Sequence, residues 1–182
     1  MRESLEDGWR EIIDGYLDRI LDAGFDGVYL DIIDAYEFFG LEGEMPERDD
    51  AAIEMLRLVG HIAARARAER PGFLVFPQNG PGILDVLTNI GRALYLQTVD
   101  GIGAEDSFYF GDDDEDNPLT VQSDAVRLLR EFRDAGRLVL AVYYLTEGAK
   151  VADFCVRARA EGFVPTVTVR ALDRMPAACP SG

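Results

Sequence analysis

Acidic, amide and tyrosine side chains follow four apolar segments of this 182-residue sequence. The first segment, GVYL, runs directly into Asp31, and Asp34 comes about one helical turn later. An apolar segment that leads into two carboxylates carries titratable groups to the edge of a core. The polar residues that follow the four segments are Asp31, Asp34 and Tyr36; Gln78 and Asn79; Glu105, Asp106 and Tyr109; and Tyr143 and Tyr144.

Several carboxylates together with amides and tyrosines suit chemistry on carbohydrates. Cleavage of a glycosidic bond needs one carboxyl group to protonate the leaving oxygen and a second to attack or to activate water. Amides bind hydroxyl groups in fixed directions, and aromatic rings cover the apolar faces of sugars. The spacing leaves other roles open, because acidic residues at such positions also serve as helix N-caps or metal ligands.

Each carboxylate has a structural alternative. Asp31 could cap the following turn, and Asp34 is better placed than Asp31 to act as a cap or an orienting partner. Glu105 lies in a glycine-rich turn and has no evident capping role. The acidic segment 111–120 is expected to be a solvated loop, since its spacing does not match a calcium-binding EF-hand. GIGAED lacks the third glycine of a dinucleotide-binding turn, so no cofactor is expected. No metal is expected either, because the sequence has no zinc-like ligand spacing.

These residues are positioned by a unit that recurs along the chain, an amphipathic helix that ends at a glycine and is followed by a short apolar strand. Gly24, Gly136 and Gly162 stand where a left-handed C-cap is needed, a conformation that costs glycine little. The first helix has apolar residues at three-and-four spacing, namely Leu5, Trp9, Ile12, Ile13, Tyr16, Leu17, Ile20 and Leu21. The strands are expected at about 27–31, 73–77, 98–103, 138–144 and 163–169.

Continuous apolar strands are buried on both faces, which predicts an α/β fold with a parallel sheet covered by helices. Five strands fit either a doubly wound sheet or part of a (β/α)8 TIM barrel. Polar residues after the strands favour the barrel, whose active sites form at that end, and so does a chain that opens on a helix. We therefore expect a partial TIM-barrel domain over 1–174, with about five βα units and the first three missing, followed by a disordered tail over 175–182.

The composition limits the kinds of molecule that this chain is expected to bind. A formal net charge of −16 repels polyphosphates, so nucleic acid is not expected, whereas a cationic substrate is compatible with it. No apolar run approaches the roughly 18 residues of a membrane span, and the acidic N-terminal segment does not resemble a signal peptide. An incomplete barrel would leave unpaired strand edges, which predicts that the chain can form oligomers.

The two cysteines and the single histidine give no metal-ligand pattern. Cys155 lies on the apolar side of a predicted helix and is expected in the core, whereas Cys179 lies in the predicted tail. His61 lies within a predicted helix and has no evident nucleophile to activate.

The segments GFDGVYLDIIDAYEFF, FPQNG and DGIGAEDSFY resemble glycoside hydrolases related to the endo-α-1,4-polygalactosaminidases, glycoside hydrolase family 114. The resemblance extends to about Arg174. It implies a TIM-barrel hydrolase that acts on an amino-sugar polysaccharide of the galactosaminan type, and a location outside the cell.

The resemblance also implies a catalytic pair, Asp31 and Glu105. By analogy with other α-retaining barrels, Asp31 is assigned as nucleophile and Glu105 as general acid/base, with the reverse assignment still open. Retention requires carboxyl groups about 5–5.5 Å apart, and inversion about 6.5–9.5 Å. Substrate-binding roles are expected for Asp34, Tyr36, Gln78, Asn79, Asp106 and Tyr144.

Two departures from the family pattern bear on activity. The first three strands of the family have no counterpart in this sequence. Relatives commonly place a glutamate where this chain has Tyr143, which is expected to remove a carboxylate from the rim. The alternatives are therefore a non-catalytic carbohydrate-binding protein or an inactive fragment of a larger hydrolase.

Overall fold

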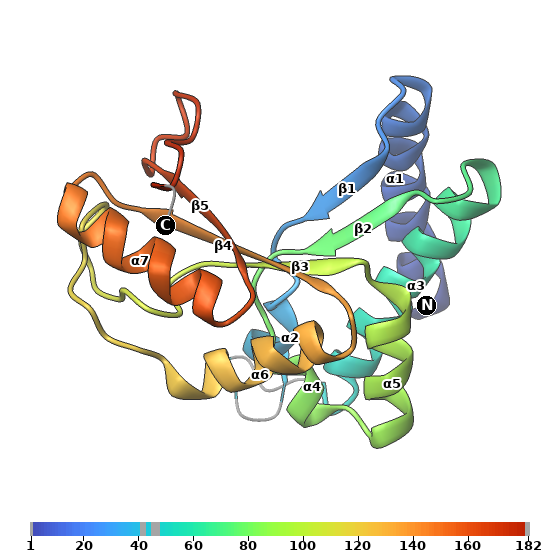
Figure 1. Cartoon of the computed structure of the whole chain (residues 1–182). Coiled ribbons are helices and arrows are strands. Elements are labelled where there is room, and N and C mark those ends of the chain that lie inside the picture. The colour runs from blue at the N-terminus through green and yellow to red at the C-terminus, as the bar shows by residue number, and fades with distance from the viewer. Residues whose placement is uncertain (1, 41–42, 45–47, 181–182) are drawn as a thin grey trace.

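The computed structural model describes residues 2–40, 43–44 and 48–180, which form alternating helices and strands (Figure 1). The strands have four to seven residues, and each connection between successive strands contains a helix of ten residues or more, as expected for βα units. In chain order the elements are α1 (Arg2–Asp22), β1 (Gly27–Leu30), α2 (Ala35–Phe39), α3 (Ala51–Glu69), β2 (Leu74–Pro77), α4 (Ile83–Val86), α5 (Asn89–Thr98), β3 (Gly101–Ala104), α6 (Ser123–Asp134), β4 (Leu138–Tyr144), α7 (Gly148–Ala160) and β5 (Val164–Thr168).

All the strand pairings between these named elements are parallel. β1 pairs with β2, and β3 pairs with β4, which pairs with β5. A parallel bridge between Gln78 and Gly103 joins the two groups, so the strands follow one another in chain order across an open arc (Figure 1). The prediction of an α/β fold with parallel strands is confirmed, and the open arc has the form expected of part of a barrel.

The strand positions match the prediction closely, with one correction. The third strand was expected at 98–103, but Thr98 ends α5 and the strand begins at Gly101. The apolar run that leads into this segment belongs to α5, so residues 98–100 were wrongly assigned to the strand. Short apolar runs of this kind fit a helix and a strand equally well, and here Thr88 starts a helix by accepting a hydrogen bond from the Gly91 N–H at 3.2 Å.

The two faces of the sheet differ in burial. Val75, Ile102 and Val139 point toward the helices and are at most 1% exposed. On the opposite face, Leu74 and Leu138 are 44% and 54% exposed. A closed barrel fills its interior with such side chains, whereas this face of the open arc remains accessible.

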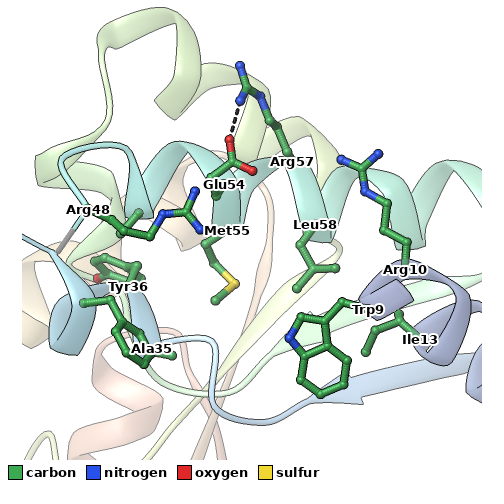
Figure 2. A pocket seen from close by; sticks show the side chains of 12 residues that line it. Trp9, Arg10, Ile13, Ala35, Tyr36, Arg48, Glu54, Met55, Arg57 and Leu58 are labelled. Atoms are coloured by element: carbon green, nitrogen blue, oxygen red, sulfur yellow. Dashed lines mark hydrogen bonds and ion pairs between the residues drawn. The ribbon is translucent and has the colours of Figure 1, made fainter. Parts of the chain in front are cut away.

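The first helix uses only part of its predicted apolar face. Leu17 and Leu21 are buried, whereas Trp9, Ile12 and Tyr16 are more than half exposed. A cavity of about 370 Å³ lies beside Trp9, between α1, α2 and α3 (Figure 2). No described helix is both long enough and apolar enough to cross a membrane.

Polar contacts attach α1 to α3. His61 Nε2 lies 2.7 Å from Asp14 Oδ1, and Arg65 forms ion pairs with Asp14 and Asp18. These contacts give His61 a structural partner 47 positions away along the chain.

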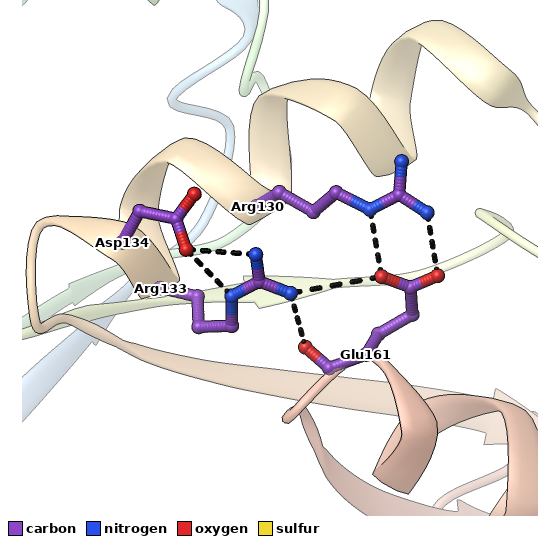
Figure 3. A network of polar contacts seen from close by, with 4 residues as sticks. All are labelled: Arg130, Arg133, Asp134 and Glu161. Carbon is purple, nitrogen blue, oxygen red and sulfur yellow. Dashed lines mark hydrogen bonds and ion pairs between the residues drawn. The ribbon is translucent and has the colours of Figure 1, made fainter.

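The helix-to-strand turns use glycine as predicted. Gly24, Gly136 and Gly162 have φ values of +85°, +76° and +76°. Next to Gly162, the Arg130 guanidinium donates to both carboxylate oxygens of Glu161 at 2.6 and 2.7 Å (Figure 3). Arg133 donates to the Glu161 carbonyl at 2.8 Å, so the ends of α6 and α7 are tied together.

The segment predicted to be a disordered tail is attached to the rest of the fold at Ala177, Cys179 and Pro180. Cys179 forms a disulfide with Cys155, which is 1% exposed in the core, as expected for Cys155. The Ala177 N–H donates to the Val167 carbonyl at 2.8 Å, which places the tail along the edge of β5. The expectation was wrong here because composition does not reveal a partner 24 residues away. Residues 181–182 lie outside the described part of the chain.

Candidate active site

The parallel strands bring the predicted polar residues to one edge of the sheet. Side chains alternate between faces along a strand, and paired residues in neighbouring parallel strands share a face. Tyr29 pairs with Phe76, Gln78 pairs with Gly103, and Tyr144 pairs with Thr168. The alternation therefore puts Asp31, Gln78, Glu105 and Tyr144 at the carboxyl ends of β1, β2, β3 and β4 on the same, less covered face.

Glu105 is held by hydrogen bonds from two other strand ends. Asn79 Nδ2 donates to Glu105 Oε2 at 3.3 Å, and the Glu105 N–H donates to Asn79 Oδ1 at 3.0 Å. The Tyr144 hydroxyl donates to Glu105 Oε1. Each carboxylate oxygen thus has its own donor, so the Glu105 side chain is oriented in advance of any ligand.

Tyr144 is itself oriented by a residue that sequence reasoning missed. The Arg170 guanidinium lies 3.8 Å from the centre of the Tyr144 ring, a cation–π contact. Burial, followed by the hydrogen bond to Glu105, raises the pKa of Tyr144, so its hydroxyl stays protonated and can donate. Arg170 follows the last strand, and only its place at a strand end could have signalled it.

Asp106, beside Glu105, is partly buried. Burial raises the pKa of the Asp106 carboxyl, the positive charge of Arg170 opposes that rise, and the negative charge of Glu105 adds to it. A carboxyl group with a raised pKa therefore lies beside Glu105, and perturbed pKa values of this kind cluster at functional sites.

Asp31 is exposed at the end of β1. One of its carboxylate oxygens accepts a hydrogen bond from the Ile32 N–H at 2.8 Å. The negative charges of Asp31 and Glu105 both raise the pKa of the same group, the Tyr29 hydroxyl. Burial raises the pKa of Tyr29 to about 12, with further contributions from the charges of Glu105 and then Asp31. The charges of both carboxylates thus reach one tyrosine, in agreement with their place on the same face of the sheet.

The chain turns sharply at each of these strand ends. Ile32, Asn79 and Asp106 have φ values of +58°, +57° and +55°. This left-handed conformation is uncommon outside glycine and costly for a β-branched residue such as Ile32. Strain of this kind collects at functional sites, where the surrounding structure holds side chains in fixed directions.

A cavity of about 420 Å³ opens beside this edge. Asp34, Asn79, Glu105 and Asp106 line it, so it includes four of the predicted residues. Asp34 stands at the N-cap position of α2, but its side chain makes no capping hydrogen bond. Residues that the sequence reasoning missed also line the cavity, namely Glu37, Phe110, Gln122 and Asp124.

Two of the predicted tyrosines, Tyr36 and Tyr109, are buried in the packing and are not exposed at the open edge of the sheet. Tyr36 is 5% exposed, and its hydroxyl lies 2.7 Å from Glu37 Oε1 and 3.2 Å from the Gly80 carbonyl oxygen. It therefore supports Glu37 and the turn after β2 from beneath. Tyr109 is 4% exposed and donates to Asp153 at 2.6 Å, a contact that attaches the segment after β3 to α7.

The expectation for Tyr143 needs correction. Tyr143 is 2% exposed and its ring centre lies 4.3 Å from that of Phe154 in α7. The Phe108 N–H donates to its hydroxyl oxygen. Position 143 faces the helices and Tyr144 faces Glu105, because neighbouring residues in a strand point in opposite directions. Tyr143 therefore takes no carboxylate away from the open edge.

The acidic segment after β3 has a structural role at Asp116. Asp116 Oδ1 accepts hydrogen bonds from the backbone N–H groups of Thr146 and Glu147, at 2.9 and 3.0 Å, which holds the turn that leads into α7. Burial works against the charged form, yet these hydrogen bonds lower the pKa of Asp116. Within 2–40, 43–44 and 48–180, no group of three or more His, Cys, Asp or Glu side chains is placed to hold a metal ion.

Comparison with known proteins identifies similar sequences. The model of glycoside-hydrolase family GH114 matches residues 4–182. An uncharacterized protein of Thermotoga maritima is 34% identical over 166 residues, and one of Deinococcus radiodurans is 33% identical over 167 residues. These matches cover 86% and 92% of this chain but 49% and 50% of the relatives. The chain thus spans about half the length of the curated relatives it matches.

Solved structures show the same fold. The glycoside hydrolase domain of PelA from Pseudomonas aeruginosa matches with a TM-score of 0.65 and 21% identity, covering 93% of this chain and 63% of that chain. A variant of that domain matches with a TM-score of 0.64 and 20% identity. At this identity the likeness establishes the fold, and it supports a partial barrel-like arrangement for the open arc.

Proposed function

We propose that this chain, which belongs to glycoside-hydrolase family GH114, hydrolyses glycosidic bonds with Asp31 and Glu105 as its two carboxylates. The observation that carries the proposal is the support of Glu105 by Asn79 and Tyr144 on the same face as Asp31. Glycosidases need two carboxyl groups from separate parts of the chain, one on each side of the scissile bond.

In the proposed reaction, an oxygen of Asp31 attacks the anomeric carbon while Glu105 gives its proton to the leaving oxygen. The glycosidic bond breaks and an ester bond to Asp31 forms. Glu105 then takes a proton from water, whose oxygen attacks the same carbon and releases Asp31. A phenolic hydroxyl both donates and accepts, so Tyr144 can follow Glu105 through its two protonation states.

The charges around the cavity support an amino-sugar polymer as substrate. All the charged residues that line the 420 Å³ cavity are acidic, and the whole chain carries a formal charge of −16. Free amino groups of a partly deacetylated galactosaminan are cationic, so this lining would attract them. Because salt screens exposed charges over about 10 Å at 0.1 M, binding should weaken as ionic strength rises.

The test is cleavage of galactosaminan oligosaccharides by the wild-type chain and by Asp31→Asn. We expect product from the wild type and a loss of at least about a hundredfold in the variant. Asp112→Asn, an exposed carboxylate in the acidic segment, serves as the control and should retain activity. Equal residual signal in the wild type and Asp31→Asn would refute the enzymatic proposal.

The open arc of strands favours a second candidate, a carbohydrate-binding protein without turnover. This chain covers about half of its curated relatives, and its inner sheet face is exposed. Calorimetric binding of the same oligosaccharides without release of product, in the wild type and Asp31→Asn alike, would identify this function.

The disulfide supports a location outside the cytosol. Disulfides persist in oxidising compartments and are rare where thiols are kept reduced. The pairing of Cys155 with Cys179 agrees with the extracellular location that the family resemblance implies. Detection of the disulfide-bonded protein in the cell-free medium of the source organism would test this location.

A further inference from the structure

The Tyr29 side chain crosses the inner face of the sheet from β1 to β3. A Cβ atom added to Gly103 would overlap the Tyr29 hydroxyl and ring, so Tyr29 occupies the space that any other residue at 103 would need. Gly103 precedes Glu105 by two positions, and Tyr29 precedes Asp31 by two. The Tyr29 hydroxyl therefore lies on the face that both carboxylates share, beside a residue two positions before Glu105 along β3.

A second aromatic ring repeats this arrangement deeper in the sheet. The Phe76 ring occupies the space beside Gly101, where an added Cβ would also overlap it. Phe76 is the parallel-sheet partner of Tyr29. The two rings fill the inner face next to β3, and the one that carries a hydroxyl is the one nearer to Glu105.

The hydroxyl of Tyr29 is available for a ligand. The residue is 46% exposed, and within the described part of the chain its hydroxyl has no hydrogen-bond partner. Since burial and the charges of Glu105 and Asp31 raise its pKa to about 12, the phenol keeps its proton at neutral pH. A protonated hydroxyl without a partner, beside Gly103 on the face that Asp31 and Glu105 share, is a donor for an incoming oxygen atom.

We propose that Tyr29 is a substrate-contacting residue that forms the floor of the gap between Asp31 and Glu105 and donates a hydrogen bond to an oxygen of the sugar held there. This inference rests on the proposed hydrolase function. Gly103 is part of the same arrangement, because only a residue without a side chain leaves room for the hydroxyl end of the Tyr29 ring beside β3. A cationic amino group of the sugar would face the carboxylates instead, since it has no lone pair to accept from a phenol.

The first test is kinetic. Tyr29→Phe keeps the ring and removes only the hydroxyl, so kcat/KM should fall about tenfold while the thermal midpoint stays unchanged. Tyr16→Phe makes the same change on an exposed tyrosine of α1 and should leave kcat/KM unaltered. Gly103→Ala should lower activity further by displacing the ring. Wild-type kcat/KM in Tyr29→Phe would overturn the inference and leave the hydrolase proposal intact.

The second test does not depend on turnover. The pKa of Tyr29, measured by NMR of ¹³Cζ-labelled tyrosine and assigned with Tyr29→Phe, should fall in both Asp31→Asn and Glu105→Gln, because each removes a negative charge near the phenol. An unchanged pKa in both variants would overturn the placement of the hydroxyl between the carboxylates. If the wild type does not cleave the oligosaccharides, the hydrolase proposal fails and the inference is tested by binding alone. Equal oligosaccharide affinity of the wild type and Tyr29→Phe, or no measurable affinity in either protein, would then overturn the inference.

Discussion

The hydroxyl of Tyr144 donates a hydrogen bond to Glu105, so the last residue of β4 orients the carboxyl group that follows β3. The two residues are 39 positions apart in sequence. Asn79, from the end of β2, donates to the other oxygen of the same carboxylate. Three neighbouring strands therefore hold one acidic side chain, and this arrangement makes specific predictions.

Tyr144→Phe should impair catalysis more than folding. It removes a hydrogen bond to a charged group, an interaction of about 1.5–3 kcal/mol, so kcat should fall about tenfold to a hundredfold. The ring remains beneath Arg170, and the thermal midpoint should change little. Steady-state kinetics and calorimetry check both effects. A variant with wild-type kcat would show that Glu105 does not depend on Tyr144.

Glu105→Gln and Asp31→Asn should respond differently to the leaving group. A general acid is needed least when the leaving group is already weakly basic, so Glu105→Gln should retain most of its first-step rate on an aryl glycoside. Asp31→Asn should stay inactive on the aryl glycoside as well as on galactosaminan oligosaccharides, because no nucleophile remains. The measurement is single-turnover release of the aryl group. The opposite pattern would reverse the two assignments.

Loss of the disulfide should lower stability. Closing a loop between residues 24 apart is worth about 3 kcal/mol, so Cys179→Ser should lower the melting temperature by about 6–12 °C. Calorimetry with and without a reducing agent tests the prediction. The agent should shift the wild type but not the variant, and a shift of equal size in both would assign the effect to something other than this bond.

Stability should fall in acid through Glu161. The hydrogen bond from Arg130 lowers the pKa of Glu161 below its ordinary value of 4.5. In the interval just below 4.5 the unfolded chain therefore binds a proton that the folded chain does not, and the free energy of unfolding falls as pH falls through it. Glu161→Gln should lose less stability over the same interval in urea titrations at different pH values. Parallel pH profiles for the two proteins would contradict this role.

The purified chain should self-associate. Val164, Leu138 and Leu74 are each more than 40% exposed on the inner face of the sheet, and within the described residues β1 has only β2 as a strand partner. Exposed apolar faces and open strand edges favour association. Sedimentation velocity over a range of concentrations should show species larger than the monomer. A compact monomer at every concentration would contradict the prediction, whereas Leu138→Gln should reduce association if the face is responsible.

Much of the arrangement is readable from local patterns. Gly24, Gly136 and Gly162 end helices because glycine adopts positive φ at little cost, a property that does not depend on the rest of the fold. The continuous apolar strands indicated a parallel sheet, and parallel strands direct Asp31 and Glu105 to the same edge. The first helix shows the limit of such patterns, since periodicity placed Trp9 and Tyr16 on its apolar face but only the structure shows that they are exposed.

By itself, then, the sequence determined the alternation of helix and strand, the parallel direction of the sheet and the acidic character of one edge, because these depend on backbone preferences and on spacing within short segments. Only the tertiary structure decided that Tyr144 and not Tyr143 meets Glu105, that Tyr29 lies against Gly103, and that Cys179 returns to Cys155. Those outcomes depend on strand register and on packing between residues far apart in the chain, where a shift of one residue would turn each side chain to the other face.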